Sequence, residues 1–437
     1  MQEESYIKRI FGNSAWIIAS KIINIIVGIV VSICVTRYLG AEQKGAMAIS
    51  SSIAGFWGFV ASFGLLDIMI SKFSKERDNS GIIAATGMTL MFGGGTVAFL
   101  LALISAIVLD VDFDIFIYVA ISAFVYFFQY LSVYEYWFYS NTNSKYFAVI
   151  QVGVHLLFLL IRVVGVPFEM GLVYFIICTA IETVVIYLSL IICYHIAKCE
   201  FIGPFSFDKV VAKDLFFQAV PMIIMGFATT IYMKVDQIMV GKLIGNIELG
   251  YYSVAINLAE YWYFIPITIY SSFLPTLTKC FVDKDIFMRR LQQFADIQML
   301  IGYLAVFMVM ILGHWGTVLL YGEEFEKSAF ILMVYIWSGI FTCLSFSGQA
   351  VYIINKDTKT VMWINLVGAA LNFVFNMIFI FIMGSIGAAL ATLVEFLLIA
   401  FGQMLLLRRK YGDLYRIQLK SFIPFFRIGK QLIKLKT

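Results

Sequence analysis

Several polar side chains of this chain lie inside long apolar stretches, where each must bind a ligand or be enclosed by other helices. The first such stretch runs from Ser14 to Ser50. It carries a set of polar and small residues at helical spacing: Lys21, Asn24, Gly28, Ser32 and Thr36. At about 100° per residue, these positions occupy an arc of about 120° on one helix face. Lipid cannot cover such a stripe, so we expect neighbouring helices or water beside it.

Two further stretches carry groups that could meet an anionic or polar ligand. Gln151, His155 and Arg162 lie within about 40° on one helix, which predicts a second inward polar face. Lys234 and Asp236 lie two residues apart and point in nearly opposite directions, so they are not expected to pair. A cation near the bilayer centre costs about 3 kcal/mol, which implies partners, snorkelling or a role in binding.

The other polar residues of the apolar stretches have a plainer interpretation. Four carboxylates are expected to be neutralised by neighbouring helices and to serve assembly: Glu135, Glu182, Glu260 and Glu395. Two neutral stripes suit either interhelical hydrogen bonds or sugar hydroxyls, and both possibilities stay open. They comprise Ser338, Thr342, Ser345, Gln349 and Tyr352, and then Asn365, Asn372 and Asn376. The six cysteines are scattered, so we expect no metal site and no cofactor.

Membrane-spanning helices must position these residues. With 62% hydrophobic and 13% charged residues and a mean hydropathy of +0.92, the chain fits an all-α polytopic membrane protein. The apolar runs predict twelve spans, at 12–36, 46–70, 81–109, 115–139, 146–166, 171–194, 214–240, 249–275, 292–314, 328–354, 360–382 and 385–407. The longest connection, about 195–213, separates two six-helix halves, 1–200 and 201–407.

Lysine and arginine outside the spans predict the orientation. If the N-terminus is cytoplasmic, only four of them lie on the opposite side: Arg37, Lys44, Lys242 and Lys327. Both termini are therefore predicted to be cytoplasmic, and the net charge of +4 indicates no nucleic acid. The basic amphipathic tail, 408–437, is expected to lie on anionic headgroups, although a solvated tail would have the same composition.

A repeat relates the two halves. Shifting the numbering by 205 superimposes Arg37 on Lys242, Gly40 on Gly245, Gly45 on Gly250 and Trp57 on Trp262. Both copies follow a long apolar span and precede another. Matched spacing in matched context predicts a duplicated architecture, a plan that transporters often use.

The opening of the chain also carries short motifs: a basic N-terminal run, Arg-Tyr-Leu-Gly at 37–40, Gly45, and Ser-Phe-Gly-Leu-Leu-Asp at 62–67. In the second half, Asp236 is followed by an apolar turn and Gly241. These residues resemble bacterial polysaccharide flippases of the multidrug/oligosaccharidyl-lipid/polysaccharide (MOP) exporter superfamily. The likeness extends over the whole chain in hydropathy, but the family often has additional C-terminal spans that are not predicted here.

The resemblance implies a non-enzymatic flippase with a central cavity. Such a protein moves oligosaccharide units linked to polyprenyl diphosphate across the bacterial cytoplasmic (inner) membrane by alternating access, in O-antigen or capsule assembly. Family members line the cavity with cations, which suit an anionic diphosphate. The resemblance implies four substrate-binding candidates, Lys21, Arg37, Arg162 and Lys234, and the polar faces described above add Asn24 and His155. If H⁺ or Na⁺ drives transport, Asp236 is the first candidate for the coupling carboxylate and Asp67 the second. Expected partners are the lipid-linked oligosaccharide, membrane lipids and polysaccharide-assembly proteins.

Other functions stay open. A multidrug exporter of the same superfamily would be expected to line its cavity mainly with carboxylates, whereas a cell-wall lipid-precursor flippase would share the cationic pattern. A membrane-embedded glycan polymerase or ligase would need a large extracytoplasmic loop with catalytic groups. The longest outside connection, about 315–327, is too short for one. The sequence therefore predicts a transporter rather than an enzyme.

Overall fold

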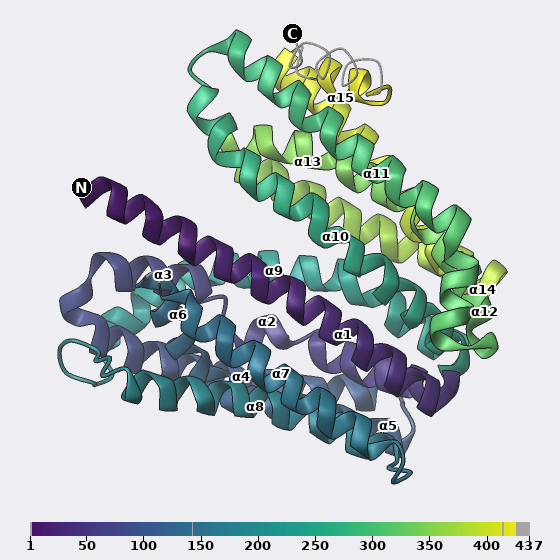
Figure 1. Ribbon diagram of the computed structural model, residues 1–437, viewed down its shortest axis with the longest axis horizontal. Helices are drawn as coiled ribbons and strands as arrows, with labels where there is room; N and C mark the ends of the chain where they lie inside the picture. The colour runs from purple at the N-terminus through teal and green to yellow at the C-terminus, as the bar shows by residue number, and fades with distance from the viewer. Residues whose placement is uncertain (1, 142, 413–414, 425–437) are drawn as a thin grey trace. The chain divides into compact units, whose positions relative to one another are not determined.

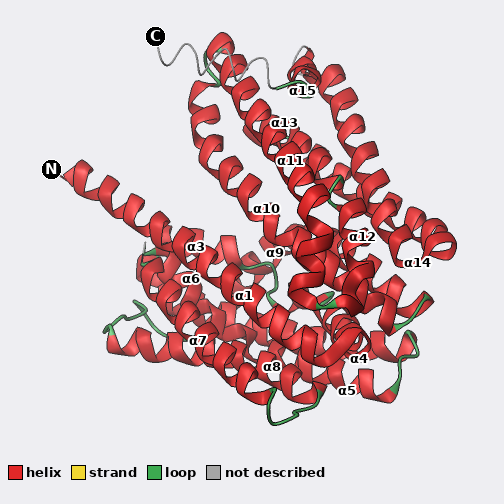
Figure 2. Ribbon diagram, turned by 45° about the vertical axis from the view of Figure 1, so that its right-hand side comes forward, coloured by secondary structure: helices red, strands yellow, loops and turns green. Residues whose placement is uncertain are grey.

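The computed structural model describes residues 2–141, 143–412 and 415–424, which form helices and no strands (Figures 1 and 2). The all-α polytopic fold is thereby confirmed. The chain groups into two compact units, Met1–Lys234 and Val235–Thr437. This division falls inside α9 (Lys209–Leu243), not in the connection near residue 200. The two six-helix halves with bounds at 1–200 and 201–407 stay a prediction.

The first unit contains α1 to α8 and most of α9. Its elements are α1 (Gln2–Gly55), α2 (Gly58–Ala61), α3 (Leu66–Lys75), η1 (Arg77–Asn79), α4 (Ser80–Val108), α5 (Phe113–Phe124), η2 (Val125–Ser132), α6 (Val133–Ser140), α7 (Ser144–Gly165) and α8 (Leu172–Ile196). Its core includes a cluster around Met69, Ile83 and Val133, all fully buried.

The second unit contains the end of α9 and the remaining helices. They are α10 (Asn246–Cys280), α11 (Lys284–Tyr321), η3 (Glu323–Phe325), α12 (Glu326–Tyr335), α13 (Ser338–Ile354), α14 (Thr358–Tyr411) and α15 (Tyr415–Ser421). Its core includes a cluster around Phe294, Ala350 and Tyr352, which come from α11 and α13.

Each predicted span corresponds to helical structure. Eight helical segments of the described residues are long and apolar enough to cross a membrane. Two of them contain a kink, and Lys359–Tyr411 covers the predicted spans 360–382 and 385–407 on either side of Gly384. The predicted spans 214–240 and 249–275 form α9 and α10, which lie outside these eight segments.

The predicted span 46–70 is not continuous. Its first part ends α1, and α2 and α3 follow after breaks. Phe63 and Gly64 both have positive φ, at 55° and 60°, which interrupts the series of helical backbone hydrogen bonds. A Cβ on Gly64 would lie 3.0 Å from the Cβ of Met222 on α9, so the break also lets α9 approach closely.

The two glycines related by the predicted repeat have the same unusual backbone. Gly40 has φ 72° and ψ 178° inside α1, and Gly245 has φ 112° and ψ 173° immediately before α10. This region of φ and ψ is essentially accessible only to glycine. Each glycine turns the chain from one span into the next without a loop, which agrees with the predicted duplication at this point.

The start of the tail packs as part of the second unit. In α15, Ile417, Gln418 and Ser421 are buried, whereas Leu419 and Lys420 on the opposite side are exposed. α11, α13 and α14 cover the buried face of this helix, and the location of the tail on headgroups stays a prediction. The rest of the predicted tail, 425–437, lies outside the described residues.

Candidate functional site

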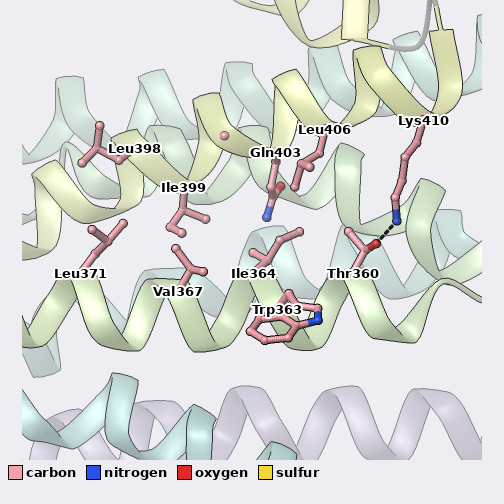
Figure 3. A pocket seen from close by; sticks show the side chains of 11 residues that line it. Thr360, Trp363, Ile364, Val367, Leu371, Leu398, Ile399, Gln403, Leu406 and Lys410 are labelled. Carbon is pink, nitrogen blue, oxygen red and sulfur yellow. Dashed lines mark hydrogen bonds between the residues drawn. The ribbon is translucent and has the colours of Figure 1, made fainter.

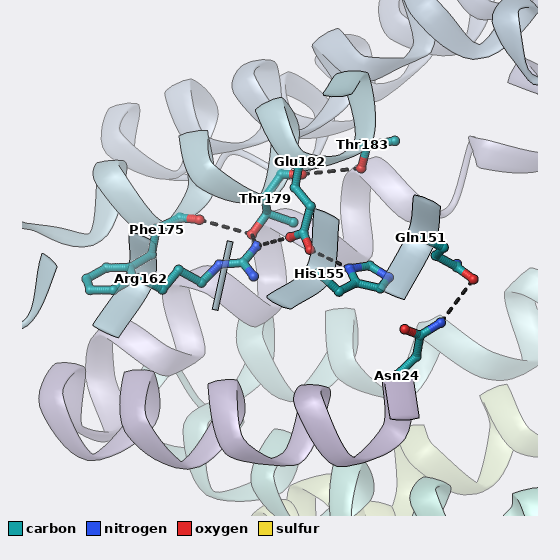
Figure 4. Close-up of polar contacts among 8 residues, drawn as sticks. All are labelled: Asn24, Gln151, His155, Arg162, Phe175, Thr179, Glu182 and Thr183. Carbon is teal, nitrogen blue, oxygen red and sulfur yellow. Dashed lines mark hydrogen bonds and ion pairs between the residues drawn. The ribbon is translucent and has the colours of Figure 1, made fainter. Parts of the chain in front are cut away.

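The predicted polar faces of α1 and α7 meet within the first unit (Figure 4). The Asn24 side chain on α1 donates a hydrogen bond of 2.9 Å to Oε1 of Gln151 on α7. Thr36, the last residue of the predicted stripe and about one turn before Gly40, is fully buried. The stripe on α1 is thus enclosed in part by α7, as its polarity requires.

A carboxylate from α8 joins this cluster. Glu182 forms ion pairs with Arg162 and with Nδ1 of His155, both on α7 (Figure 4). Arg162 also donates to the hydroxyl of Thr179 over 3.1 Å. The side chains of Arg162 and Glu182 are each 8% exposed and that of His155 is 27% exposed, so His155 is the member most accessible to a ligand.

Close packing of α7 on α8 explains why these groups meet. A Cβ on Gly165 would lie 2.3 Å from the ring of Tyr174, so only glycine permits this approach. The Tyr174 hydroxyl donates to the carbonyl of Ile161 over 2.7 Å, which fixes the register of the two helices. Arg162 then faces the turn of α8 that carries Thr179 and Glu182.

The ion pair changes the charge available for binding. The Arg162 cation is neutralised by Glu182, so the cluster carries a net positive charge only when His155 is protonated. Glu182 does meet the cations of a neighbouring helix, as expected of it, but its place at the centre of this cluster was not predicted. One signal was present: Glu182 is the only charged residue in the predicted span 171–194, and a lone intramembrane carboxylate needs a partner.

The other three predicted binding residues, Lys21, Arg37 and Lys234, form no ion pair with this cluster. Lys21 and Arg37 are exposed on α1, and Lys234 is half-buried on α9. None of the three forms an ion pair within the described part of the chain. Asp67 is exposed in the first turn of α3, where the helix N-terminus favours its negative charge.

The second unit holds a separate buried acidic cluster. Oδ2 of Asp236 accepts a hydrogen bond of 2.5 Å from the Tyr252 hydroxyl, and Oδ1 accepts one of 2.7 Å from the backbone N–H of Gln237. Glu395 on α14 is fully buried and within electrostatic reach of Asp236. Among the described residues, neither carboxylate oxygen of Glu395 has a hydrogen-bond partner of good geometry.

Buried amides complete this second cluster. Asn376 donates to the side-chain and backbone oxygens of Asn372, each over 2.9 Å, and both residues are at most 1% exposed. Asn372 lies close to Glu395. Two carboxylates and two amide oxygens in one buried region are the ligand types that hard cations prefer, and protonation is the other way to remove such charge. The sequence predicted Asp236 here but treated Glu395 as an assembly residue.

Many apolar helices with charged residues buried among them define the class of multi-span membrane proteins. The family model described as Polysaccharide biosynthesis protein matches residues 10–281, more than half of the chain. The chain therefore belongs to this family, and its resemblance to the polysaccharide flippases of the MOP superfamily is confirmed. A second family model, Lipid II flippase MurJ, matches residues 251–433. No curated protein sequence matches significantly.

Solved structures share the fold at low identity. A multidrug resistance MATE family transporter of the MOP superfamily, inward-facing, is 12% identical with a TM-score of 0.73, covering 90% of this chain and 96% of that one. The lipid II flippase MurJ, inward closed, is 17% identical with a TM-score of 0.66, covering 94% and 92%. A MOP superfamily transporter from Pyrococcus furiosus, described by a binding pocket of reversed polarity, is 12% identical with a TM-score of 0.60, covering 93% and 96%.

Proposed function

We propose that the chain is a flippase that translocates polyprenyl-diphosphate-linked oligosaccharide units across the bacterial cytoplasmic membrane by alternating access, for surface polysaccharide synthesis. The family match over residues 10–281 carries this proposal. It places the chain among polysaccharide biosynthesis proteins, and a membrane chain of this kind with intramembrane cations suits transport of an anionic glycolipid better than catalysis. Both termini are proposed to be cytoplasmic.

The proposed substrate site uses cations of the first unit. Lys21, Arg37 and Lys234 supply charge for the diphosphate, because Arg162 already pairs with Glu182. Asn24 and His155 supply hydrogen bonds to the substrate. The side-chain amide of Asn24 is held in place by its hydrogen bond to Gln151. Arg162 contributes by holding Glu182 and, through it, His155, so its role is to position the site. If a phosphate displaced Glu182 from this pair, the positive charge of Arg162 would become available to the substrate.

Asp236 is the proposed ion-coupling residue. It is 5% exposed and near the fully buried carboxylate of Glu395, so binding of H⁺ or Na⁺ there would reduce the repulsion between two buried carboxylates. Asp67 is the second candidate, and its exposed position makes it the less suitable one. No metal or organic cofactor is proposed.

A cell-wall lipid-precursor flippase is the second candidate function. The match of residues 251–433 to the lipid II flippase MurJ model favours it. A lipid-precursor flippase would need the same cationic residues, because its substrate also carries an anionic headgroup on a polyprenyl chain. A drug exporter is supported only by fold similarity to MATE transporters at 12% identity.

Loss of the protein tests the proposal. A strain lacking it should accumulate lipid-linked oligosaccharide in the cytoplasmic leaflet and lose surface polysaccharide. Complementation with Lys21→Ala, Arg37→Ala or Lys234→Ala should restore less export at equal protein level in the membrane. Unchanged surface glycan with arrested cell-wall synthesis would favour the lipid-precursor flippase, and unchanged glycan with new drug sensitivity would favour the exporter.

A further inference from the structure

An apolar groove runs between the two arms of α14, on either side of Gly384 (Figure 3). It has a volume of about 350 Å³. Ile364, Val367 and Leu371 of the first arm face Leu398 and Ile399 of the second. From Thr360 to Leu371 the groove follows about 16 Å of helix, the length of a substantial part of a lipid chain. Val367 is 48% exposed and Leu398 41%, so the groove is open on one side along its length.

One polar side chain lies in the floor of this groove. Gln403 is only 6% exposed, and its Oε1 is buried without a hydrogen-bond partner. A Cβ on Gly348 of α13 would lie 3.1 Å from that oxygen, so the oxygen is turned towards α13. Figure 3 shows the amide nitrogen between the two arms, above Ile364. An amide donor in an otherwise apolar groove indicates a ligand with an acceptor at that depth.

The end of the groove is basic. Lys410 lies there, donating to the hydroxyl of Thr360 and pairing with Asp357 at 2.9 Å. The adjoining sequence, 356–360 and 408–410, holds one carboxylate, Asp357, and four further bases, Lys356, Lys359, Arg408 and Arg409. The excess of positive charge favours an anionic headgroup at this end.

We propose that this groove binds one anionic glycerophospholipid, with its phosphate at the basic end and one acyl chain between the arms. The order of groups along the groove matches such a lipid: base, then amide donor, then apolar wall. Gln403 lies seven residues, or about 10 Å, deeper than Lys410. A glycerophospholipid carries its ester carbonyls between the phosphate and the acyl chains, so an amide donor between the basic end and the apolar wall is placed to meet one. The ester distinguishes this ligand from a polyprenyl phosphate, whose chain offers no acceptor to Gln403.

Glycine substitutions test the groove with a matched control. A Cβ on Gly402, which lines the groove, meets no atom within 4 Å, so Gly402→Phe places a ring in open space inside it. Gly93 on α4 is also helical, also has nothing within 4 Å and lies outside the groove, so Gly93→Phe is the control. The measurement is native mass spectrometry of purified full-length protein titrated with dioleoyl phosphatidylglycerol.

We expect one phosphatidylglycerol bound tightly to the unchanged protein and to Gly93→Phe, and at least tenfold weaker binding to Gly402→Phe. Phosphatidylcholine, which has the ester but no net charge, should bind more weakly than phosphatidylglycerol to the unchanged protein. Equal phosphatidylglycerol binding by both glycine variants would overturn the proposal. Tighter binding of a polyprenyl phosphate than of phosphatidylglycerol would also overturn it, because the groove would then fit the tail of a prenyl lipid.

Gln403→Leu provides a test that does not depend on steric filling. Replacing a buried group whose oxygen is unpartnered by an apolar one of similar size should preserve or raise the melting temperature in lipid-free detergent. The same change should weaken phosphatidylglycerol binding by about fivefold, the value of one hydrogen bond. Unchanged lipid affinity of a folded Gln403→Leu protein would contradict the assignment of the ester carbonyl to this amide.

Discussion

Arg162 on α7 and Glu182 on α8 form an ion pair in which each side chain is only 8% exposed. The pair lies inside helices that cross the membrane, where neither charge is stable alone. Arg162 also donates a hydrogen bond to the Thr179 hydroxyl, and Glu182 also pairs with His155. The cluster is therefore a unit whose members should be altered together rather than singly.

Breaking this pair should destabilise the protein. Glu182→Gln leaves the buried Arg162 cation uncompensated and should cost about 3–5 kcal/mol. Arg162→Met leaves Glu182 with His155 as its partner, so its cost should be smaller. The double variant Arg162→Met/Glu182→Met should recover most of the loss, since both charges are gone. The measurement is thermal unfolding in detergent, with Thr183→Val, whose hydroxyl only bonds within α8, as the control. Additive losses in the double variant would show that the two residues act independently.

Alanine at Gly40 or Gly245 should be costly. Both residues have positive φ with ψ near 180°, where a Cβ adds about 1–3 kcal/mol of strain. The melting temperatures of Gly40→Ala and Gly245→Ala should therefore fall. Gly93→Ala, in a helix with open space around it, should be neutral or stabilising. If all three variants melt alike, the two turns do not depend on glycine.

Acid should weaken the connection between α13 and α14 through Asp357. The Lys410 ammonium, with Thr360 and Tyr411, lowers the pKa of Asp357 from its ordinary value of 3.8 to about 2. The ionised carboxylate thus favours the fold: its contribution is complete above pH 3.8 and is lost as the pH falls towards 2. Melting curves between these pH values should show a smaller loss for Lys410→Gln than for the unchanged protein. The control Lys359→Gln should lose as much stability on acidification as the unchanged protein. If its loss is instead as small as that of Lys410→Gln, the effect comes from the overall positive charge of this region and not from the pair of Lys410 with Asp357.

Glu248 should stabilise the end of the second unit where α10 begins. It accepts from Lys327 and from Ser385, each at 2.5 Å, and Ser385 directly follows the kink at Gly384. Glu248→Gln should lower stability by about 1 kcal/mol, since the pair is partly exposed. Glu326→Gln breaks the more exposed pair with His314 and should change the melting temperature little. Equal effects of the two changes would mean that the bond to Ser385 contributes nothing.

Much of the fold could be predicted because the membrane requires it. A span must be apolar for about 20 residues, so its place in the sequence is visible. The turn at Gly40 and its counterpart at Gly245 could be predicted because both spacing and residue type repeat. The break at Phe63 and Gly64 could not, because the residues around it are as apolar as a continuous helix.

The candidate site was harder to predict because pairing depends on neighbouring helices. The face shared by Gln151, His155 and Arg162 followed from helical spacing, and in the structure each of the three contacts a polar side chain of another helix. Their partner Glu182 lies on another helix, and helix neighbours and register depend on contacts such as that of Gly165 with Tyr174. Spacing along one helix carries no information about such contacts.

The turn at Gly40 also limits how the chain can be probed. Because the two helical parts of α1 meet at the kink at Gly40 with no intervening loop, a tag or protease site inserted there would disturb the ends of both parts. Gly384 in α14 imposes the same limit. The connection from Val166 to Gly171, between α7 and α8, has no such constraint and should tolerate an insertion. Near Gly40, a single cysteine at the exposed position 37 is the better reporter of the membrane side, because it leaves the backbone intact.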